Sequence, residues 1–514
     1  MKKVLFSCAL FSCALVYAQE PADALRLSYT IPSGTARHQA IGGAMGSLGG
    51  DITATYVNPA GLAFYKTGDV VLSPSYRFGK NKGTYLGRTE KGSQNKFDLG
   101  TSGVIYAAGS NQGRVRSHAV SLALNTTADF RNNILYRGVN TQSSYSQQFV
   151  EELGNNNIKT IDGAANGFPF GSSLAFNTYW IDSSGSTAGI RSFRSRAGAL
   201  AASGLIQEQK IETRGGIYEP SLGFAINYSD KLMLGGSVSI PYVYYNREAT
   251  FTEADATDNP NNEFDFATLK ESVTRSGLGF NAKAGVIYKP QEFWRLGFAI
   301  HSPTIYGLRD ENRVDVTTDT EKYKGLLSDN STTYPDAGSD FRYSFVTPYK
   351  IIGSISYVLR EIQDVTKQKG FLTADVEYIN HKASSYQPEN SEEAVTSAED
   401  EAYLESLNEA IDKSYKGAFN FRAGGELKFT TLMVRLGAAY YGNPYKDIRG
   451  EKGSKLNLSG GLGYRNKGLF VDLAYVHSMN KEVLFPYRLQ NGFSPRADVR
   501  IRAGNVLLTF GVKI

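Results

Sequence analysis

Apolar and polar residues alternate one by one over many short segments of this chain. At the C-terminus, residues 505–514 place Val506, Leu508, Phe510 and Val512 on one face, which we take as the outer face. Neighbouring side chains of a β-strand point to opposite sides, so a period of two predicts strands with two different faces. About a dozen further segments show the same pattern, which predicts an all-β fold.

Residues 371–379 give the clearest pattern. Leu372, Val376 and Tyr378 share one face, while Asp375 and Glu377 share the other. Two acids on one face and apolar groups on the other fit a barrel strand between lipid and a wet interior. A soluble sandwich strand, with its acids in bulk water, is the alternative. In the other alternating segments, the side chains that share one face of their strand are Val70, Leu72, Pro74, Tyr76 and Phe78; Val120, Leu122 and Leu124; Leu232, Leu234, Val238 and Ile240; and Trp294, Leu296, Phe298 and Ile300.

The segments between these strands fall into two classes that alternate along the chain. Short connections are expected near 110–114, 228–230, 289–291, 361–368, 430–431 and 466–468. Long polar connections are expected near 80–97, 131–203, 252–269, 313–338, 385–414, 445–454 and 482–497. Short turns at one end and long loops at the other are typical of outer-membrane barrels. We therefore predict a transmembrane antiparallel β-barrel of about 14 strands over residues 68–514, with long extracellular loops.

The first residues have the features of a secretory signal peptide. Two lysines precede an apolar run over residues 4–16, and small residues form a cleavage site before Gln19. We predict a signal peptide over residues 1–18; a lipoprotein signal modified at Cys13 is the alternative. Both cysteines, Cys8 and Cys13, lie in this segment, so the mature chain would carry no thiol.

Charge and composition argue against several functions. The net charge is +5 for 514 residues, and the basic residues are scattered among acids, which predicts no nucleic-acid partner. No run of 18 apolar residues follows the signal, so no transmembrane helix is expected. The five histidines are far apart in the sequence, which predicts no metal site, and no cofactor motif is present. We expect no enzyme, although His118 with Ser121 is the alternative that a barrel enzyme would offer.

Residues 19–67 lack the alternation and predict a compact segment of short helices and turns before the first strand. Its sharpest motif is Asn58-Pro59-Ala60-Gly61. Asn before Pro starts a turn, Pro fixes its own φ, and Gly61 can adopt a positive φ. An ordinary turn is the alternative. Helices are also expected over 141–153 and 392–415, inside two of the long loops.

The stretch 44–63, which contains this motif, resembles the N-terminal signature of the FadL/TodX-type outer-membrane transporters. Residues 295–303, which end in Ser-Pro, are similar to a mid-barrel strand of that family. The resemblance implies a monomeric barrel in the cell outer membrane whose lumen is plugged by an N-terminal hatch, residues 19–67, toward the periplasm. Asn58, Pro59 and Ala60 match the hatch motif.

The same resemblance implies import of long-chain fatty acids or other hydrophobic small molecules, with outer-membrane lipid around the barrel. It also implies a lateral exit at a kinked third strand, which corresponds to residues 115–130. That segment contains no glycine or proline, so the sequence shows no kink. The chain ends in Ile514, whereas many relatives end in Phe.

The loop over residues 164–180 is rich in aromatic side chains. Candidate residues for external ligand capture are Phe168, Phe170, Phe176, Tyr179 and Trp180. A loop packed on its own small core is the alternative. A second hypothesis for function is a non-transporting barrel that binds protein partners, similar to the shuttle of type IX secretion. A general porin is disfavoured because porin lumens lack an N-terminal plug. An apolar tunnel would favour transport, and a polar or filled lumen would favour the scaffold.

Overall fold

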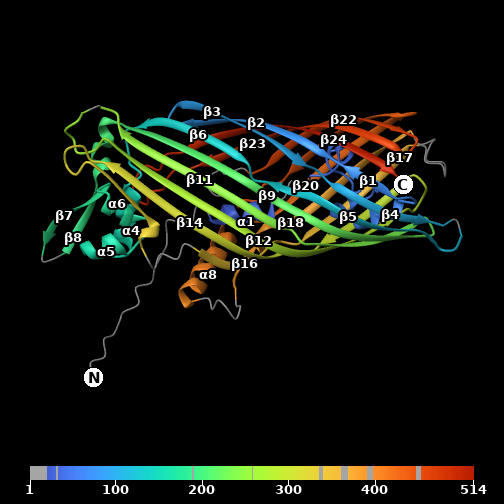
Figure 1. The fold of residues 1–514 in the computed structure, drawn as a ribbon, viewed down its shortest axis with the longest axis horizontal. Coiled ribbons are helices and arrows are strands. Elements are labelled where there is room, and N and C mark those ends of the chain that lie inside the picture. The colour runs from blue at the N-terminus through green and yellow to red at the C-terminus, as the bar shows by residue number, and fades with distance from the viewer. Residues whose placement is uncertain are drawn as a thin grey trace, which may run out of the picture.

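The chain forms a closed barrel of antiparallel strands (Figure 1). The computed structural model describes residues 20–29, 33–110, 112–187, 190–257, 259–334, 340–359, 369–389, 397–446 and 453–514. Its main sheet contains 22 strand segments, which form fourteen wall strands. Strand β24 closes the ring because it pairs with β23 on one side and with β1 and β2 on the other. The predicted barrel and its strand count are confirmed.

Several wall strands are interrupted and therefore carry two labels. The first seven wall strands are β1 (Asp69–Leu72) with β2 (Pro74–Tyr85), β3 (Arg88–Leu99) with β4 (Ser102–Gly109), β5 (Val115–Asp129) with β6 (Asn132–Asn140), β9 (Leu205–Tyr228), β10 (Leu232–Ser239) with β11 (Tyr242–Asp255), β12 (Phe266–Tyr288), and β13 (Trp294–His301) with β14 (Ile305–Asp319). The other seven are β16 (Asp340–Val346) with β17 (Lys350–Leu359), β18 (Gly370–Asn380) with β19 (Ser385–Pro388), β20 (Gly417–Phe429), β21 (Leu432–Tyr441), β22 (Lys455–Asn466), β23 (Leu469–Leu484) and β24 (Ala497–Lys513). β15 (Leu326–Asn330) pairs with β14 beyond the wall.

The predicted strand faces are confirmed. In β18, Leu372 is 60% exposed and Val376 is 43% exposed, whereas Asp375 is 1% exposed and points into the barrel. The same division holds for Phe298 against His301 in β13. The outward side chains together form an apolar band around the barrel, and a surface so large and apolar is matched by bilayer hydrocarbon. Within the described ranges, no helix is long and apolar enough to cross a membrane.

The wall strands extend further than the alternation predicts. The predicted long loop over 80–97 is wrong, because β2 and β3 pair throughout it up to a turn at Leu86 and Gly87. Strands β12 and β14 likewise continue into the predicted loops 252–269 and 313–338. Outside the apolar band both faces of a strand are polar, so the period of two disappears while the hydrogen-bonded ladder continues.

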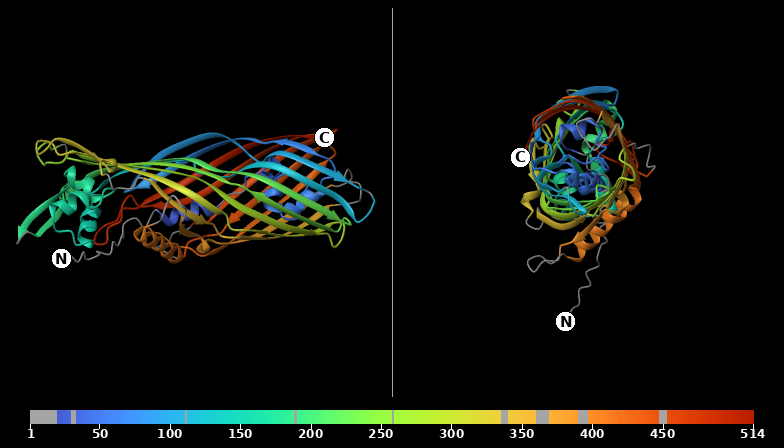
Figure 2. Two further views of the ribbon diagram at one scale, coloured as in Figure 1. Left: turned by 60° about the horizontal axis from the view of Figure 1, so that its bottom comes forward. Right: turned by 90° about the vertical axis from the view of Figure 1, so that its right-hand side faces the viewer.

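The N-terminal residues from 20 onward lie inside the ring of strands, as the end-on view shows (Figure 2). We call residues 33–67 the inner segment. The helices here are α1 (Glu20–Ser28), α2 (Ala36–Ala40), α3 (Ala54–Val57) and the 3-10 helix η2 (Pro59–Phe64). The predicted signal peptide, the predicted turn at 361–368 and most of the predicted loop 445–454 lie outside the described residues.

A helical cap covers the end of the barrel opposite the C-terminus (Figure 1). It contains α4 (Gln147–Asn155), α5 (Ile161–Asn166), α6 (Ser172–Asn177), α7 (Arg196–Leu200), η3 (Ala201–Ser203) and the hairpin of β7 (Ile181–Thr187) and β8 (Ile190–Ser195). Farther along, the chain forms η4 (Ser331–Thr333), η6 (His381–Ala383) and α8 (Ala398–Ser414). Helices are therefore present in both loops where the sequence predicts them, although α4 begins six residues later than expected.

Candidate functional site

Asn58 joins the inner segment to the barrel wall. Its side chain is buried and caps η2, because Oδ1 accepts a hydrogen bond of 3.1 Å from Ala60 N. Its Nδ2 donates to Gly46 O at 2.6 Å and lies 3.3 Å from Val286 O of β12. Pro59 occupies the first helical position, where its missing N–H costs nothing. The motif thus starts a helix and fastens it to the wall.

Gly61 has a different role from the one its turn pattern predicts. The turn pattern predicts a positive φ at Gly61, but Gly61 lies within η2 and its φ is not in the left-handed region. Its constraint is space, since a Cβ would lie 2.9 Å from Ala54 Cβ and 3.0 Å from Gly49 Cα. The expectation of a left-handed glycine here is wrong because the chain continues as a 3-10 helix after Pro59.

Wall side chains bind the backbone of the inner segment. Asp375 Oδ2 accepts hydrogen bonds from Met45 N at 2.9 Å and Gly46 N at 3.0 Å. Further wall contacts to this segment are Arg295 Nη1 to Leu48 O (2.8 Å), Ser237 Oγ to Thr55 O (2.8 Å), His301 Nε2 to Val57 O (2.9 Å), Ser117 Oγ to Ala63 O (2.6 Å) and Thr509 Oγ1 to Ala36 N (2.8 Å). Because these bonds satisfy buried backbone groups, they fix the segment in one position.

Lumen-facing glycines let the inner segment touch the wall directly. A Cβ added at Gly297 would collide with Gly46 O, and one at Gly437 would collide with Gly42 N. A Cβ added at Gly235, Gly285 or Gly424 would clash with other atoms of the inner segment. Strand glycines usually weaken a sheet, so their presence here reflects this close backbone approach.

A cavity of about 110 Å³ lies between α1, the inner segment and the wall. Leu27 and Ser28 of α1 line it on one side, and Thr53, Tyr56 and Val57 of the inner segment line it on another. Its wall residues include the charged side chains of Glu219, Lys283, Lys350, Glu377 and Arg422. The cavity therefore has charged groups beside an apolar lining, whereas a simple transport route predicts a tunnel lined by apolar groups alone.

Two buried ion pairs define the chemistry of this cavity. Lys283 Nζ lies 2.6 Å from Glu219 Oε1, and Arg422 Nη2 lies 2.7 Å from Glu377 Oε1. Asn420 Nδ2 also donates to Glu377 at 2.7 Å. Buried ion pairs of this kind add little net stability but hold their groups in defined positions. Sequence reasoning found Glu377 on a polar face but missed its partners, which come from other strands.

The five candidate capture aromatics do not form one open surface. Trp180 is fully buried, donates from Nε1 to Glu253 Oε1 at 2.9 Å, and stacks on Tyr145 with ring centroids 5.5 Å apart. Phe168 and Phe176 are partly buried against the same core, and Tyr179 packs edge-on against Tyr323 at 5.6 Å. Phe170 is exposed. The structure thus places most of these side chains in the core of the cap.

The ladder between the second and third wall strands covers only part of their length. β4 pairs with β5 from Ser102 opposite Leu124 to Gly109 opposite Ser117. Among the described ladders, β3 pairs only with β2. β5 has a register shift at Thr126 and stops before β6. The third strand is therefore interrupted even though its sequence has no glycine or proline.

No family model and no curated protein matches this chain. Solved structures do match. A Pseudomonas aeruginosa FadL homologue aligns with a TM-score of 0.53 and 14% identity over 94% of this chain and 99% of that one. This chain has the same fold. The P. putida toluene transporter TodX aligns with a TM-score of 0.51 and 12% identity over 94% of this chain and 99% of that one. A TodX mutant described as a monoaromatic hydrocarbon channel aligns equally well, with a TM-score of 0.52.

Proposed function

We propose that this chain is an outer-membrane transport protein that imports hydrophobic small molecules, and that residues 20–67 act as its hatch. The observation that carries the proposal is a closed, lipid-facing barrel whose bore is occupied by a segment bonded to the wall on many sides. The fold is shared with a FadL homologue and with a toluene transporter. On this proposal the short turns and the hatch face the periplasm, and the helical cap faces outward.

Long-chain fatty acids are the substrate class that the cavity supports best. Its lining carries three cations and two carboxylates, a net charge of +1. A carboxylate headgroup fits this charge, whereas an uncharged hydrocarbon such as toluene gains nothing from it. The cavity is smaller than the 300 Å³ or so of ordinary ligand pockets, so passage of a whole fatty acid requires α1 to move away from it. The lateral exit implied by the family resemblance stays a prediction.

A non-transporting barrel that binds protein partners is the second candidate. The observation that favours it is a lumen that holds the inner segment and two buried ion pairs, whereas transport of an apolar solute would use an apolar path from the cap to the hatch. The cap aromatics, which are mostly packed into a core, point the same way.

Bound lipid and uptake separate the two functions. The full chain, extracted without detergent, is analysed by native mass spectrometry for co-purified fatty acid, and cells that produce it are tested for uptake of labelled oleate. Transport predicts both bound lipid and faster uptake than in cells without the barrel. Absence of both would remove the transport proposal and leave the scaffold.

An Asn58→Ala variant tests the role of the hatch. The substitution removes the bonds that hold η2 to Gly46 and β12, so we expect entry of a polar dye that the parent barrel excludes. Asn466→Ala is the matched control, because Asn466 is the exposed last residue of β22 and its side chain bonds to Tyr464 of the same strand. Equal dye exclusion by all three proteins, with all three folded, would show that Asn58 does not hold a hatch.

A further inference from the structure

Basic side chains lie directly opposite one another on the outer face of four adjacent strands. Lys481 of β23 pairs in register with Arg500 of β24, Arg500 with Lys82 of β2, and Lys82 with Lys91 of β3. All four side chains are exposed. The strand order therefore builds a continuous row of four positive charges across the barrel surface.

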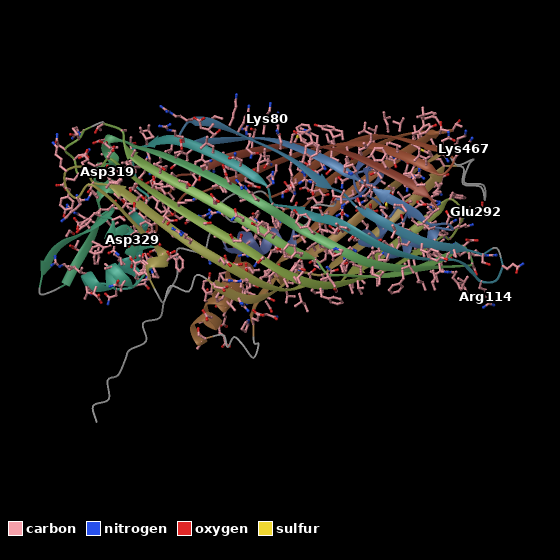
Figure 3. The ribbon with its side chains drawn as sticks, viewed as in Figure 1. Lys80, Arg114, Glu292, Asp319, Asp329 and Lys467 are labelled. Carbon is pink, nitrogen blue, oxygen red and sulfur yellow. The ribbon has the colours of Figure 1, made fainter. Side chains whose placement is uncertain are left out.

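A second cationic row lies next to the first. Arg502 of β24 is opposite Lys80 of β2, one outward position nearer the apolar band. Both side chains are exposed, and Lys80 points away from the barrel (Figure 3). We call these six side chains the basic patch: Lys80, Lys82, Lys91, Lys481, Arg500 and Arg502.

The basic patch borders the apolar band along an aromatic edge. Phe78 lies two residues before Lys80 on the same face, and its ring is 6.5 Å from that of Tyr475. Tyr76 and Phe97 follow one row further, with ring centroids 4.8 Å apart. Two residues along a strand span about 6.8 Å, so the cations lie within one to three rows of a membrane-interface aromatic girdle. That depth corresponds to lipid headgroups.

Wall stability does not explain this arrangement. Like charges directly opposite in a sheet are destabilising. Within the part of the chain that the structure describes, none of the six cations has an ion pair. The next row outward contains Asp498, but its partner is Arg496 at 3.0 Å.

Other sectors of the barrel neutralise their outward cations. On β12 and β14, Lys270 lies 3.8 Å from Glu248, Arg309 lies 2.8 Å from Asp340, and Arg313 lies 2.7 Å from Asp315. The basic patch differs because its positive charges face one another without acids between them. A negatively charged ligand that binds from outside the barrel would neutralise these facing cations.

We propose that the basic patch binds the phosphate groups of lipopolysaccharide in the outer leaflet. The assignment rests on the outer-membrane placement proposed above. Phosphates of this lipid lie at the depth of the patch, and arginine and lysine are the side chains that recognise them. The acyl chains of the same lipid cover the aromatic edge formed by Phe78, Phe97 and Tyr475.

Lipid binding to the full-length barrel tests the proposal. A triple variant, Lys80→Ala with Arg500→Ala and Arg502→Ala, is compared with a control triple variant, Lys270→Ala with Arg309→Ala and Arg313→Ala. Each is titrated with bisphosphorylated lipid A, with its dephosphorylated form and with phosphatidylglycerol, and bound lipid is counted by native mass spectrometry. At about fivefold per lost cation, we expect the patch variant to bind lipid A roughly 100-fold more weakly, and the control to match the parent.

Each outcome decides the assignment. Equal lipid A affinity in the patch and control variants would overturn it, and so would equal binding of the dephosphorylated lipid. Phosphatidylglycerol bound as tightly as lipid A would show general attraction to anions and overturn the choice of lipopolysaccharide. The oleate assay distinguishes this proposal from the transport proposal. A patch variant that no longer binds lipid A but still takes up oleate would support lipopolysaccharide binding and leave the transport proposal unchanged.

Discussion

The inner segment and α1 lie in the same bore but are held there in different ways. Backbone atoms of the inner segment bond to the wall, and lumen-facing glycines bring the two backbones into contact. For α1, the described residues show side-chain contacts with the wall and no backbone bond to it. Displacing the inner segment would leave buried backbone groups without partners, whereas displacing α1 breaks side-chain contacts only.

α1 is held in the bore by charged contacts and by apolar packing, all of them made by side chains. Asp23 Oδ2 lies 3.2 Å from Arg275 Nη2, and the Arg26 guanidinium lies 4.3 Å from the centre of the Tyr245 ring. Leu27 is buried in an apolar cluster with wall residues such as Val243 and Phe345, and Ser28 Oγ lies 3.3 Å from His381 Nδ1. The inner segment is therefore bonded to the wall through its backbone, while α1 contacts the wall through side chains alone.

The largest effect is expected from filling a contact between the two backbones. In a Gly297→Val variant the new side chain clashes with Gly46 O. The clash is between backbone segments, so it cannot be relieved by a change of side-chain rotamer. We expect the free energy of unfolding in urea to fall by about 3 kcal/mol, at the upper end of the usual cost of overpacking.

Gly353→Val is the matched control for this substitution. Gly353 also lies on a wall strand, but a Cβ there has no atom within 4 Å. Its free energy of unfolding is expected to match the parent. Equal losses in both variants would mean that valine disturbs the strands generally and that the inner segment is not in close contact with the wall.

A smaller effect is expected from removing an acceptor of the inner segment. Asp375→Ala leaves Met45 N and Gly46 N buried without their partner. We expect the free energy of unfolding to fall by about 2 kcal/mol, since unsatisfied buried groups cost roughly this much. Asp375→Asn keeps one acceptor oxygen and is expected to lose less. Asp412→Ala on α8 removes an exposed carboxylate and serves as control. An equal loss for Asp375→Asn and Asp375→Ala would argue against the two backbone bonds.

Local pattern was sufficient to predict the barrel but not its contents. The outward faces, such as Leu372 against Asp375, follow from alternation within a few residues and were correct. The pairing of Lys283 with Glu219 joins residues 64 positions apart, so it depends on strand register that no local pattern specifies. The burial of Trp180 likewise depends on Glu253, from a distant strand.

The motif around Asn58 shows what a short sequence can and cannot reveal. Asn before Pro correctly marks the start of a local element, because capping involves only residues 58–60. The bonds from Asn58 to Gly46 and β12, which give the residue its place in the bore, involve partners chosen by the tertiary fold. Gly61 was misread for the same reason, since crowding by Gly49 and Ala54 is invisible in the sequence.

The smallest effect is expected from releasing α1. Asp23→Ala breaks its bond to Arg275, while Arg275 keeps Asp310, with bonds of 2.8 and 2.6 Å. We expect hydrogen exchange at residues 24–28 to become about tenfold faster, because the bond to Arg275 and the Arg26–Asp23 ion pair within α1 are lost, while exchange in the inner segment and the midpoint of unfolding stay unchanged. Asp498→Ala, which removes an exposed ion pair far from α1, should leave both regions as they are. If the inner segment exchanged faster together with α1, the two would form one cooperative unit, and movement of α1 alone could not open the cavity.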